Sequence, residues 1–262
     1  MTDIAVIILQ KNEALHIGRC LERLSELAPR QIFVVDCFST DGSDKTAADM
    51  GATVVQHEWP GCQSVQFNWA LDNLPIAAEW VLRLDADEYL TTETAARLRD
   101  ELPRLPGDVT GLTLELRRRF MGGEIRHGTS GIRLLRAFRN HVGRCEERAM
   151  DEHIQLGEGR CVDFDGAFYD DNLNTMDWWR EKHRGYARRE AVDALAGEKF
   201  KSSKALYYRC PRYLRAVAYF LYRYVLRLGF LDGYAGWMWH FWQGLWYRWI
   251  VDAEIARMKR GG

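Results

Sequence analysis

Short apolar runs alternate with segments of helical periodicity through the first half of the chain. The apolar runs predict buried strands at residues 4–9, 32–36, 53–55 and 80–84. Asn12 is a plausible N-cap for a helix that reaches Leu27, with Leu15, Leu21 and Leu24 on its inner face. Residues 62–73 predict a further helix between the last two strands. Strands that alternate with helices predict βαβ units and an α/β fold with a mostly parallel sheet, covered by helices on both faces.

The pattern changes after about residue 110. Residues 112–116 and 132–138 predict two more strands, separated by a polar, Gly-rich loop. Residues 151–175 are acidic and show no regular period, so we expect irregular structure there. From Met176 onward helical periodicity continues to the end of the chain.

These patterns divide the chain into two domains. The first, residues 1–175, combines a nucleotide-binding half at about 1–110 with an acceptor half at about 111–175. The second, residues 176–262, is a helical, aromatic-rich C-terminal appendage.

Composition narrows the class of protein. A content of 47% hydrophobic and 28% charged residues excludes a disordered chain. The six cysteines form no CxxC pair, which disfavours structural zinc and a disulfide framework and fits a reduced, cytoplasmic setting. The N-terminal apolar run is too short for a signal peptide.

The net charge of −1 conceals an asymmetry. Residues 199–262 contain 12 basic and three acidic side chains, whereas the preceding residues carry an acidic excess. A basic, aromatic C-terminal region attached to an acidic body suggests a negatively charged partner.

The spacing of the tryptophans in this region predicts how it contacts that partner. Trp239, Trp242, Trp246 and Trp249 are spaced by 3, 4 and 3 residues, which places the four indoles on one helical face. The charge-free run 233–247 is shorter than the roughly 20 residues that span a bilayer. We therefore expect residues 205–250 to lie on an anionic membrane surface. The alternatives are packing on the catalytic domain or on a second subunit, which leaves the oligomeric state open. Nucleic acid is disfavoured as a partner because no recognised binding motif accompanies the aromatics.

The strongest candidate chemistry is Asp85-Ala86-Asp87-Glu88, at the end of an apolar strand. Adjacent carboxylates repel one another, and a divalent cation that prefers oxygen ligands would relieve the repulsion and bridge to phosphate. Ligands bind at this edge of open α/β sheets. The alternative is a solvated acidic turn before a helix capped by Thr91.

Two further polar clusters follow predicted strands. Asp36 ends the second strand and can accept hydrogen bonds from a base or ribose, with Ser39 supporting the turn. Asp41 and Ser43 fit turn and capping chemistry equally well. Capping also explains Asn12 after the first strand, but three clusters at three successive strand ends together favour a ligand site.

The order of these motifs resembles family 2 glycosyltransferases with the GT-A fold. The matching stretches are KNEA at 11–14, VVDCFSTDGS at 34–43, FNWAL at 67–71 and LRLDADE at 82–88. Later stretches resemble the branch that builds bacterial lipopolysaccharide core, capsule and related surface glycans: HGTSGIRLLRAFR at 127–139, MDEHI at 150–154 and WWREKHRGYARREA at 178–191. The resemblance covers roughly residues 4–190.

The resemblance implies roles for individual residues on the donor side. Those implied to contact the nucleotide-sugar are Asn12, Glu13, Asp36, Gln66, Asn68, Asp85 and Ala86. Asp87 is implied to ligate Mn²⁺ or Mg²⁺ held by the donor diphosphate. Many members have a second acid where this chain has Cys37, which makes uridine specificity less secure.

The acceptor side is implied in the same way. Glu152 aligns with the general base that deprotonates the acceptor hydroxyl, with Asp151 as the alternative. A structural role for these two acids is the competing interpretation. His127, Arg133 and Arg136 are implied to contact acceptor or phosphate, although an arginine on a strand is equally often a surface residue.

Together these features predict an inverting, metal-dependent enzyme that moves a sugar from a nucleotide-sugar, a UDP-sugar by resemblance, to a lipid-linked saccharide or lipopolysaccharide-core acceptor. We expect it to be cytoplasmic and peripheral on the inner face of the cell membrane. The alternative is a non-catalytic membrane-associated scaffold that keeps the fold. Nucleotidyl transfer is disfavoured because no Gly-rich basic loop follows the first strand.

Overall fold

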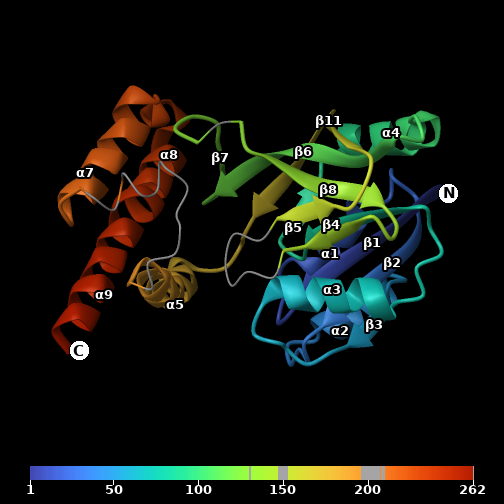
Figure 1. Cartoon of the computed structure of the whole chain (residues 1–262), viewed down its shortest axis with the longest axis horizontal. Coiled ribbons are helices and arrows are strands. Elements are labelled where there is room, and N and C mark those ends of the chain that lie inside the picture. Colours follow the sequence, from blue (N-terminus) through green and yellow to red (C-terminus); the bar gives the residue numbers. More distant parts are fainter. Residues whose placement is uncertain (130, 147–152, 196–206, 208–209, 262) are drawn as a thin grey trace. The chain divides into compact units, whose positions relative to one another are not determined.

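The computed structural model describes residues 1–129, 131–146, 153–195, 207 and 210–261 (Figure 1). The chain divides into two compact units. Unit 1 comprises Met1–Arg117 and Gly131–Leu173, and unit 2 comprises Arg118–Ser130 and Asn174–Gly262. The segment Arg118–Ser130, which the sequence pattern assigns to the acceptor half, therefore groups with the C-terminal region.

Unit 1 begins with a parallel sheet. Its four strands are adjacent in the order β3-β2-β1-β4 and are β1 (Thr2–Gln10), β2 (Pro29–Asp36), β3 (Thr53–Gln56) and β4 (Trp80–Asp85). Residues 4–10 of β1 are all buried, because a central parallel strand is covered on both faces. These are the four predicted strands, and their parallel pairing is confirmed.

The sheet continues beyond β4 in the order β8-β6-β11-β5, and β7 pairs with β6. These strands are β5 (Glu88–Leu90), β6 (Val109–Phe120), β7 (Gly123–Ile125), β8 (Arg133–Arg139) and β11 (Arg160–Asp171). A separate antiparallel pair consists of β9 (Gly143–Cys145) and β10 (Ile154–Leu156). The pairings β4–β8, β6–β8 and β5–β11 are antiparallel, so the sheet is mixed.

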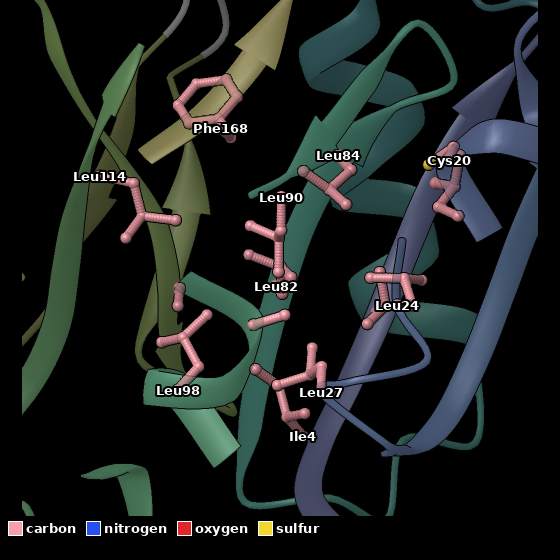
Figure 2. Packing of buried hydrophobic residues seen from close by; sticks show 14 of the residues in the cluster. Ile4, Cys20, Leu24, Leu27, Leu82, Leu84, Leu90, Leu98, Leu114 and Phe168 are labelled. Carbon is pink, nitrogen blue, oxygen red and sulfur yellow. The ribbon is translucent and has the colours of Figure 1, made fainter. Parts of the chain in front are cut away.

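Helices cover the two faces of this sheet. The helices of unit 1 are α1 (Ile17–Glu22), α2 (Ser43–Asp49), α3 (Gln63–Asn73), α4 (Thr92–Glu101) and the 3₁₀ turn η1 (Leu102–Arg104). Alternate residues of β1 enter opposite cores, as the pleat requires. Ile4, Val6 and Ile8 pack with α1 and α4 in the core of Figure 2. Ala5, Ile7 and Leu9 pack with α3 in the second core.

The helix predicted from Asn12 to Leu27 is wrong in its bounds. Helix α1 has six residues, Asn12 adopts a left-handed backbone with φ 56°, and Leu15 is 61% exposed. The amides of residues 12–14 donate to side chains of the loop after β2, at Ser39, Ser43 and Asp41. Those side chains satisfy the amides without helical geometry, so the helix begins later.

The prediction of irregular structure at 151–175 is also wrong, because β10 and the 12-residue β11 lie there. In β11 the inward side chains of Val162 and Phe164 alternate with the exposed acids Asp163 and Asp165. This period of two is the pattern of a half-buried strand, and the acidic composition conceals it.

Unit 2 is mainly helical. Its helices are α5 (Met176–Leu195), α7 (Leu214–Leu221), the π-helical η2 (Tyr222–Leu226), the 3₁₀ turn η3 (Gly229–Asp232), α8 (Gly233–Trp239), the π-helical η4 (His240–Trp246) and α9 (Tyr247–Gly261). Helices α5 and α9 pack through Ala187, Ala191, Tyr247, Val251 and Ile255. In the described part of the chain, every helix is too short or too polar to cross a bilayer.

The expected exposed stripe of four indoles is wrong for three of them. Trp239, Trp242 and Trp246 pack in one cluster around Phe120 and Trp179, and Trp249 is 45% exposed. The π-helical segment η4 interrupts the 3.6-residue period on which the expectation rests. Other apolar side chains of unit 2 are exposed instead: Leu214, Leu221, Leu226, Leu228, Phe230, Leu231, Tyr234 and Trp237.

Candidate donor site at the carboxyl edge of the parallel strands

The polar clusters predicted at strand ends lie along one edge of the sheet. Gln10 of β1 is in register with Asp36 of β2, and Leu9 of β1 is in register with Asp85 of β4. Because β2 and β4 flank β1 on opposite sides, the chain order reverses across β1. Such a switch point is where open α/β sheets bind ligands.

Asp36 organises the loop after β2. It is fully buried, and Oδ1 accepts from Gln10 Nε2 at 2.9 Å while Oδ2 accepts from the Ser39 amide at 2.8 Å. Ser39 Oγ also donates to Oδ1. The carboxylate therefore fixes the turn, and its predicted contact with base or ribose stays a prediction.

Asn12 and Glu13 tie the loop after β1 to that turn. Asn12 Oδ1 accepts from the Thr40 amide at 2.8 Å, and the Asn12 amide donates to Ser39 Oγ at 2.8 Å. Glu13 Oε2 lies 2.6 Å from Nδ1 of the buried His16. The Leu173 amide donates to Nε2 of the same ring at 2.8 Å, so Nδ1 carries the proton that Glu13 accepts. The two loops form one hydrogen-bonded unit.

Asp41 contributes to the same unit. Desolvation would raise its pKa, but hydrogen bonds from the Ser43 hydroxyl and the amides of Ala14 and Ser43 outweigh it and lower the pKa. Its role is therefore turn formation, which is the alternative considered for it from the sequence.

The Asp85–Glu88 segment concentrates carboxylates. Asp85 Oδ1 is buried with no hydrogen-bond partner, and the nearby Arg83 Nη2 is 3.9 Å away. Asp87 Oδ2 accepts from Asn172 Nδ2 at 2.9 Å. Ala86 is buried, so only its backbone can meet a ligand. An unsatisfied carboxylate oxygen next to a second carboxylate suits a divalent cation.

Glu88 completes the segment and is buried with Arg136, whose Nη2 lies 2.5 Å from Glu88 Oε1. Burial raises the pKa of Glu88 to about 8, Arg136 opposes the rise, and Asp85 and Asp87 add to it. The raised pKa therefore reflects burial first, and the nearby carboxylates of Asp85 and Asp87 second.

Asp85 and Asp87 by themselves leave most coordination positions of a divalent cation open. In the parts of the chain that are described, no three or more His, Cys, Asp or Glu side chains are arranged to hold a metal ion. Asp85 and Asp87 therefore fit a metal that takes its other oxygen ligands from a bound phosphate.

Comparison with known proteins decides the family. The model of the family described as "Glycosyl transferase family 2" matches residues 5–147, which contain the four parallel strands and the Asp85–Glu88 segment. The chain belongs to this family. The match and the mixed sheet confirm the predicted GT-A fold.

Curated relatives of this family 2 chain match over limited lengths. An uncharacterized glycosyltransferase of Rickettsia felis is 34% identical over 102 residues, covering 39% of this chain and 33% of the relative. A TPR repeat-containing protein of Synechococcus elongatus is 28% identical over 140 residues, covering 53% and 32%. The chain thus matches about a third of the length of each relative.

Solved structures show distant similarity. Mannosyl-3-phosphoglycerate synthase from Rubrobacter xylanophilus is 17% identical with a TM-score of 0.42, over 76% of this chain and 77% of that one. Glucosyl-3-phosphoglycerate synthase from Mycobacterium tuberculosis, in complex with Mn²⁺ and UDP-glucose, is 19% identical with a TM-score of 0.37, over 44% and 43%.

Two other predicted donor residues of this family 2 chain lie on α3 and are buried. Gln66 Oε1 is 2.7 Å from His57 Nδ1, and Gln66 Nε2 donates to Cys37 Sγ at 3.2 Å. Asn68 donates to the Cys145 carbonyl at 3.0 Å and accepts from the Cys145 amide at 2.9 Å. Asn68 thus holds β9 against α3, and its predicted nucleotide contact stays a prediction.

The predicted acceptor residues are not brought together within one unit. Arg133 donates to the Thr113 and Phe164 carbonyls and Arg136 is buried with Glu88, both in unit 1. His127 belongs to unit 2, where its Nδ1 is 2.5 Å from Asp232 Oδ1. Asp151 and Glu152 lie outside the described residues.

Sequence reasoning missed the end of β11 as part of the edge. Asp171 Oδ2 accepts from Arg19 Nη1 at 2.8 Å, and the Asp171 amide donates to the Asp87 carbonyl at 3.1 Å. Together with the hydrogen bond from Asn172, these contacts fix the backbone and the side chain of Asp87, the candidate metal ligand. The available signal was the polar run Asp170–Asn172 at the end of an alternating segment.

Proposed function

We propose that the chain transfers a sugar, with inversion, from a nucleotide-sugar to a saccharide acceptor, and that the donor is a UDP-sugar bound with Mn²⁺ or Mg²⁺ at Asp87. The observation that carries the proposal is the register of the strand ends. Gln10, Asp36 and Asp85 end three adjacent parallel strands at one edge, in a chain that belongs to glycosyl transferase family 2.

The residues of this edge have separable tasks. The loops held by Asn12 and Asp36 are hydrogen-bonded to each other before any ligand arrives, so they can receive base and ribose with little reorganisation. Asp85 and Asp87 would hold the metal, with Asn172 orienting Asp87. When bound, a divalent cation supplies neutralisation of the departing nucleoside diphosphate.

Transfer also needs a base. In an inverting displacement the acceptor oxygen bonds to the anomeric carbon as the bond from that carbon to the diphosphate oxygen breaks. The hydroxyl proton then passes to a carboxylate, for which we propose Glu152, with Asp151 as the alternative.

The acceptor is proposed to be a lipid-linked saccharide or lipopolysaccharide core, used at the cytoplasmic face of the membrane. Three observations support this: the resemblance of residues 127–191 to the surface-glycan branch, the basic excess after residue 199, and the exposed apolar side chains of unit 2. Anionic liposomes should therefore bind the native chain, and Leu226→Glu with Leu231→Glu should abolish binding without changing UDP affinity. Unchanged liposome binding would reject the membrane role.

The donor proposal is tested by calorimetric titration of the purified chain with UDP, GDP and CDP, each with and without Mn²⁺. We expect UDP to bind tightly and only with metal. Binding of GDP or CDP instead of UDP would show that the donor is a sugar linked to that other nucleotide. No binding of any nucleotide by folded protein with metal would reject the enzymatic function and favour the scaffold alternative.

A further inference from the structure

Unit 2 contains a buried arginine that forms no ion pair with any carboxylate among the described residues. Arg223, in the π-helical segment η2, is 3% exposed, and its Nε and Nη2 have no hydrogen-bond partner. A buried guanidinium normally has an acidic partner, because an isolated charge is expensive to remove from water. Arg215, eight residues upstream, follows that rule by pairing with Asp252.

The surroundings of Arg223 add positive charge. Desolvation lowers the pKa of Arg223, Tyr219 opposes this, and Arg118 and Arg248 lower the pKa further. The Arg223 guanidinium lies 5.3 Å from the centre of the Tyr219 ring. Arg248 is paired with Glu190 at 2.8 Å, so that carboxylate is already engaged. Among the described residues the position accumulates cations, and the neighbouring acid Asp232 is paired with His127.

Other buried polar atoms of α8 and η4 are also unsatisfied. Trp239 Nε1 and Gln243 Oε1 have no hydrogen-bond partner in the described chain, whereas the His240 ring is hydrogen-bonded to the His127 backbone. Burial, and then Arg223, lower the pKa of His240 to about 4, so the ring is neutral at physiological pH. The neutral ring has one N–H donor, which the His127 backbone engages.

Two glycines place the His240 ring against the backbone of Arg223. A Cβ atom at Gly128 would lie 2.2 Å from His240 Cε1 and 3.0 Å from the Arg223 carbonyl oxygen. A Cβ atom at Gly229 would lie 2.4 Å from the ring and 2.9 Å from the same oxygen. Only glycine therefore fits at these two positions, and the polar groups are held together by close packing.

The same residues lie on irregular helix. Arg223 is in η2, and His240 and Gln243 are in η4, both of them π-helical. Single π-helical turns are rare and occur frequently at functional sites. Two of them meet at the unsatisfied polar groups, which is a second indication, independent of the charge, that the cluster serves a ligand.

We propose that Arg223, together with the indole N–H of Trp239, binds a phosphoryl group in unit 2. A guanidinium fork supplies two parallel donors to such a group, and the indole supplies a third. The site is distinct from the donor site of unit 1 and requires neither nucleotide nor metal. The phosphoryl group can belong to a lipid, since Leu226, Phe230 and Leu231 near Arg223 in sequence are exposed, or to a soluble phosphate.

The first experiment titrates the full chain with inorganic phosphate in metal-free buffer, at constant ionic strength against chloride. We expect saturable binding by the native chain and none by Arg223→Met. The matched control is Arg227→Met, which removes an exposed guanidinium four residues away and should bind like the native chain. At tenfold excess over Kd, phosphate should raise the Tm of the native chain by about 3 °C and leave that of Arg223→Met unchanged.

A milder variant protects the test against misfolding. Trp239→Phe keeps an aromatic ring and removes the indole N–H, and it should weaken phosphate binding about tenfold. Absence of phosphate binding by the folded native chain, or equal binding by native chain and Arg223→Met, would overturn the proposal unless the vesicle experiment below shows Arg223-dependent binding.

The second experiment identifies the source of the phosphoryl group with vesicles of phosphatidylcholine, with or without phosphatidic acid. Binding that requires phosphatidic acid and is lost in Arg223→Met supports a lipid phosphate. Binding of inorganic phosphate alone supports a soluble ligand. If neither inorganic phosphate nor phosphatidic acid vesicles bind in a way that depends on Arg223, the site is rejected. Because no nucleotide is present in either experiment, this failure is separate from any failure of the donor proposal.

Discussion

Among the described residues each unit buries two arginines, Arg83 and Arg136 in unit 1 and Arg215 and Arg223 in unit 2, and the contrast lies between Arg136 and Arg223. In unit 1, Arg136 of β8 is paired with Glu88 and its guanidinium lies 4.6 Å from the Phe168 ring centre. In unit 2, Arg223 has an aromatic neighbour, Tyr219, and no described carboxylate beside it. Burial alone therefore does not reveal the role of an arginine, whereas the group that balances its charge does. The charge of Arg136 is balanced by Glu88 within the folded chain, and the proposed phosphoryl ligand would balance the charge of Arg223.

The same contrast extends to the neighbouring polar groups. At the edge of unit 1, Asp36, Asn12 and Asp41 are bonded to the chain itself, which gives the loops a fixed shape, and Asp85 Oδ1, a candidate for the metal, is left unsatisfied. Around Arg223, buried polar atoms are left without partners. Satisfied groups define where a ligand can bind, and unsatisfied ones define what the ligand must bring.

The largest expected effect comes from removing the proposed metal ligand in unit 1. Asp87→Ala should abolish metal-dependent binding of UDP, because Asp87 is the carboxylate that Asn172 orients toward the edge. Calorimetry with Mn²⁺ measures this directly. Asp72→Ala, which removes an exposed carboxylate paired with Arg144, is the control and should bind normally. Full binding by Asp87→Ala would leave the carboxylate edge without its proposed role.

A second large effect concerns the base, outside the described residues. Glu152→Gln should lower kcat by about 10²–10⁴-fold while donor affinity is kept, since the amide cannot accept the hydroxyl proton. Steady-state transfer and UDP titration separate the two quantities. If Asp151→Asn were inactive and Glu152→Gln fully active, the base would be Asp151.

One matched pair of substitutions tests the contrast between Arg136 and Arg223. Arg136→Met should destabilise the fold by about 3 kcal/mol, the low end for a broken buried pair, because Glu88 can escape its charge by protonation. Urea unfolding measures the loss, and adding Glu88→Gln should recover part of it. Arg223→Met, in phosphate-free buffer, should cause no loss. A similar loss for both variants would contradict the distinction drawn between them.

The smallest expected effect is at the loop after β1. Asn12→Ala removes the bond to the Thr40 amide and places alanine at φ 56°, which should cost about 1–2 kcal/mol and weaken UDP binding. Asn12→Gly relieves the backbone strain and should lose less. Asn73→Ala, whose amide donates only to Trp69 in its own helix, should be nearly neutral. Equal losses for Asn12→Ala and Asn12→Gly would show that the left-handed backbone contributes nothing.

The sequence predicts the parallel half of the fold well, because each strand is a short apolar run and each ends in polar residues. The position of Asp36 beside β1, and of Asp85 on its other side, follows from strand order. The start of α1 could not be predicted, since amides at 12–14 are bonded to side chains about 30 residues away in the sequence. The prediction that four tryptophans share one helical face likewise assumes an unbroken period of 3.6 residues. The π-helical segment η4 changes that period between Trp239 and Tyr247.

The site residues divide in the same way. Asp85 and Asp87 are recognisable as acidic residues at the end of an apolar strand. The position of Asn172 could not be predicted, because it follows β11, whose acidic composition hides the alternating pattern of a strand. Arg223 and His240 carry no sequence signal, because an arginine in an aromatic helix predicts a solvated side chain. The burial of both side chains, and the packing of Gly128 and Gly229 on the His240 ring, show that these groups are enclosed.

Unit 2 is built from two separated stretches of chain, and this bears on the order of events during synthesis. The chain leaves unit 1 after Arg117, re-enters at Gly131, and completes unit 1 at Leu173. The His127 side chain and the carboxylate of Asp232 that holds it are 105 residues apart. At roughly 5–20 residues per second, the segment 118–130 waits several seconds on the ribosome before its partner helices emerge. A nascent chain at that stage carries a finished unit 1 together with a hairpin whose Phe120 and Ile125 stay uncovered, and open to chaperones, until α8 is made.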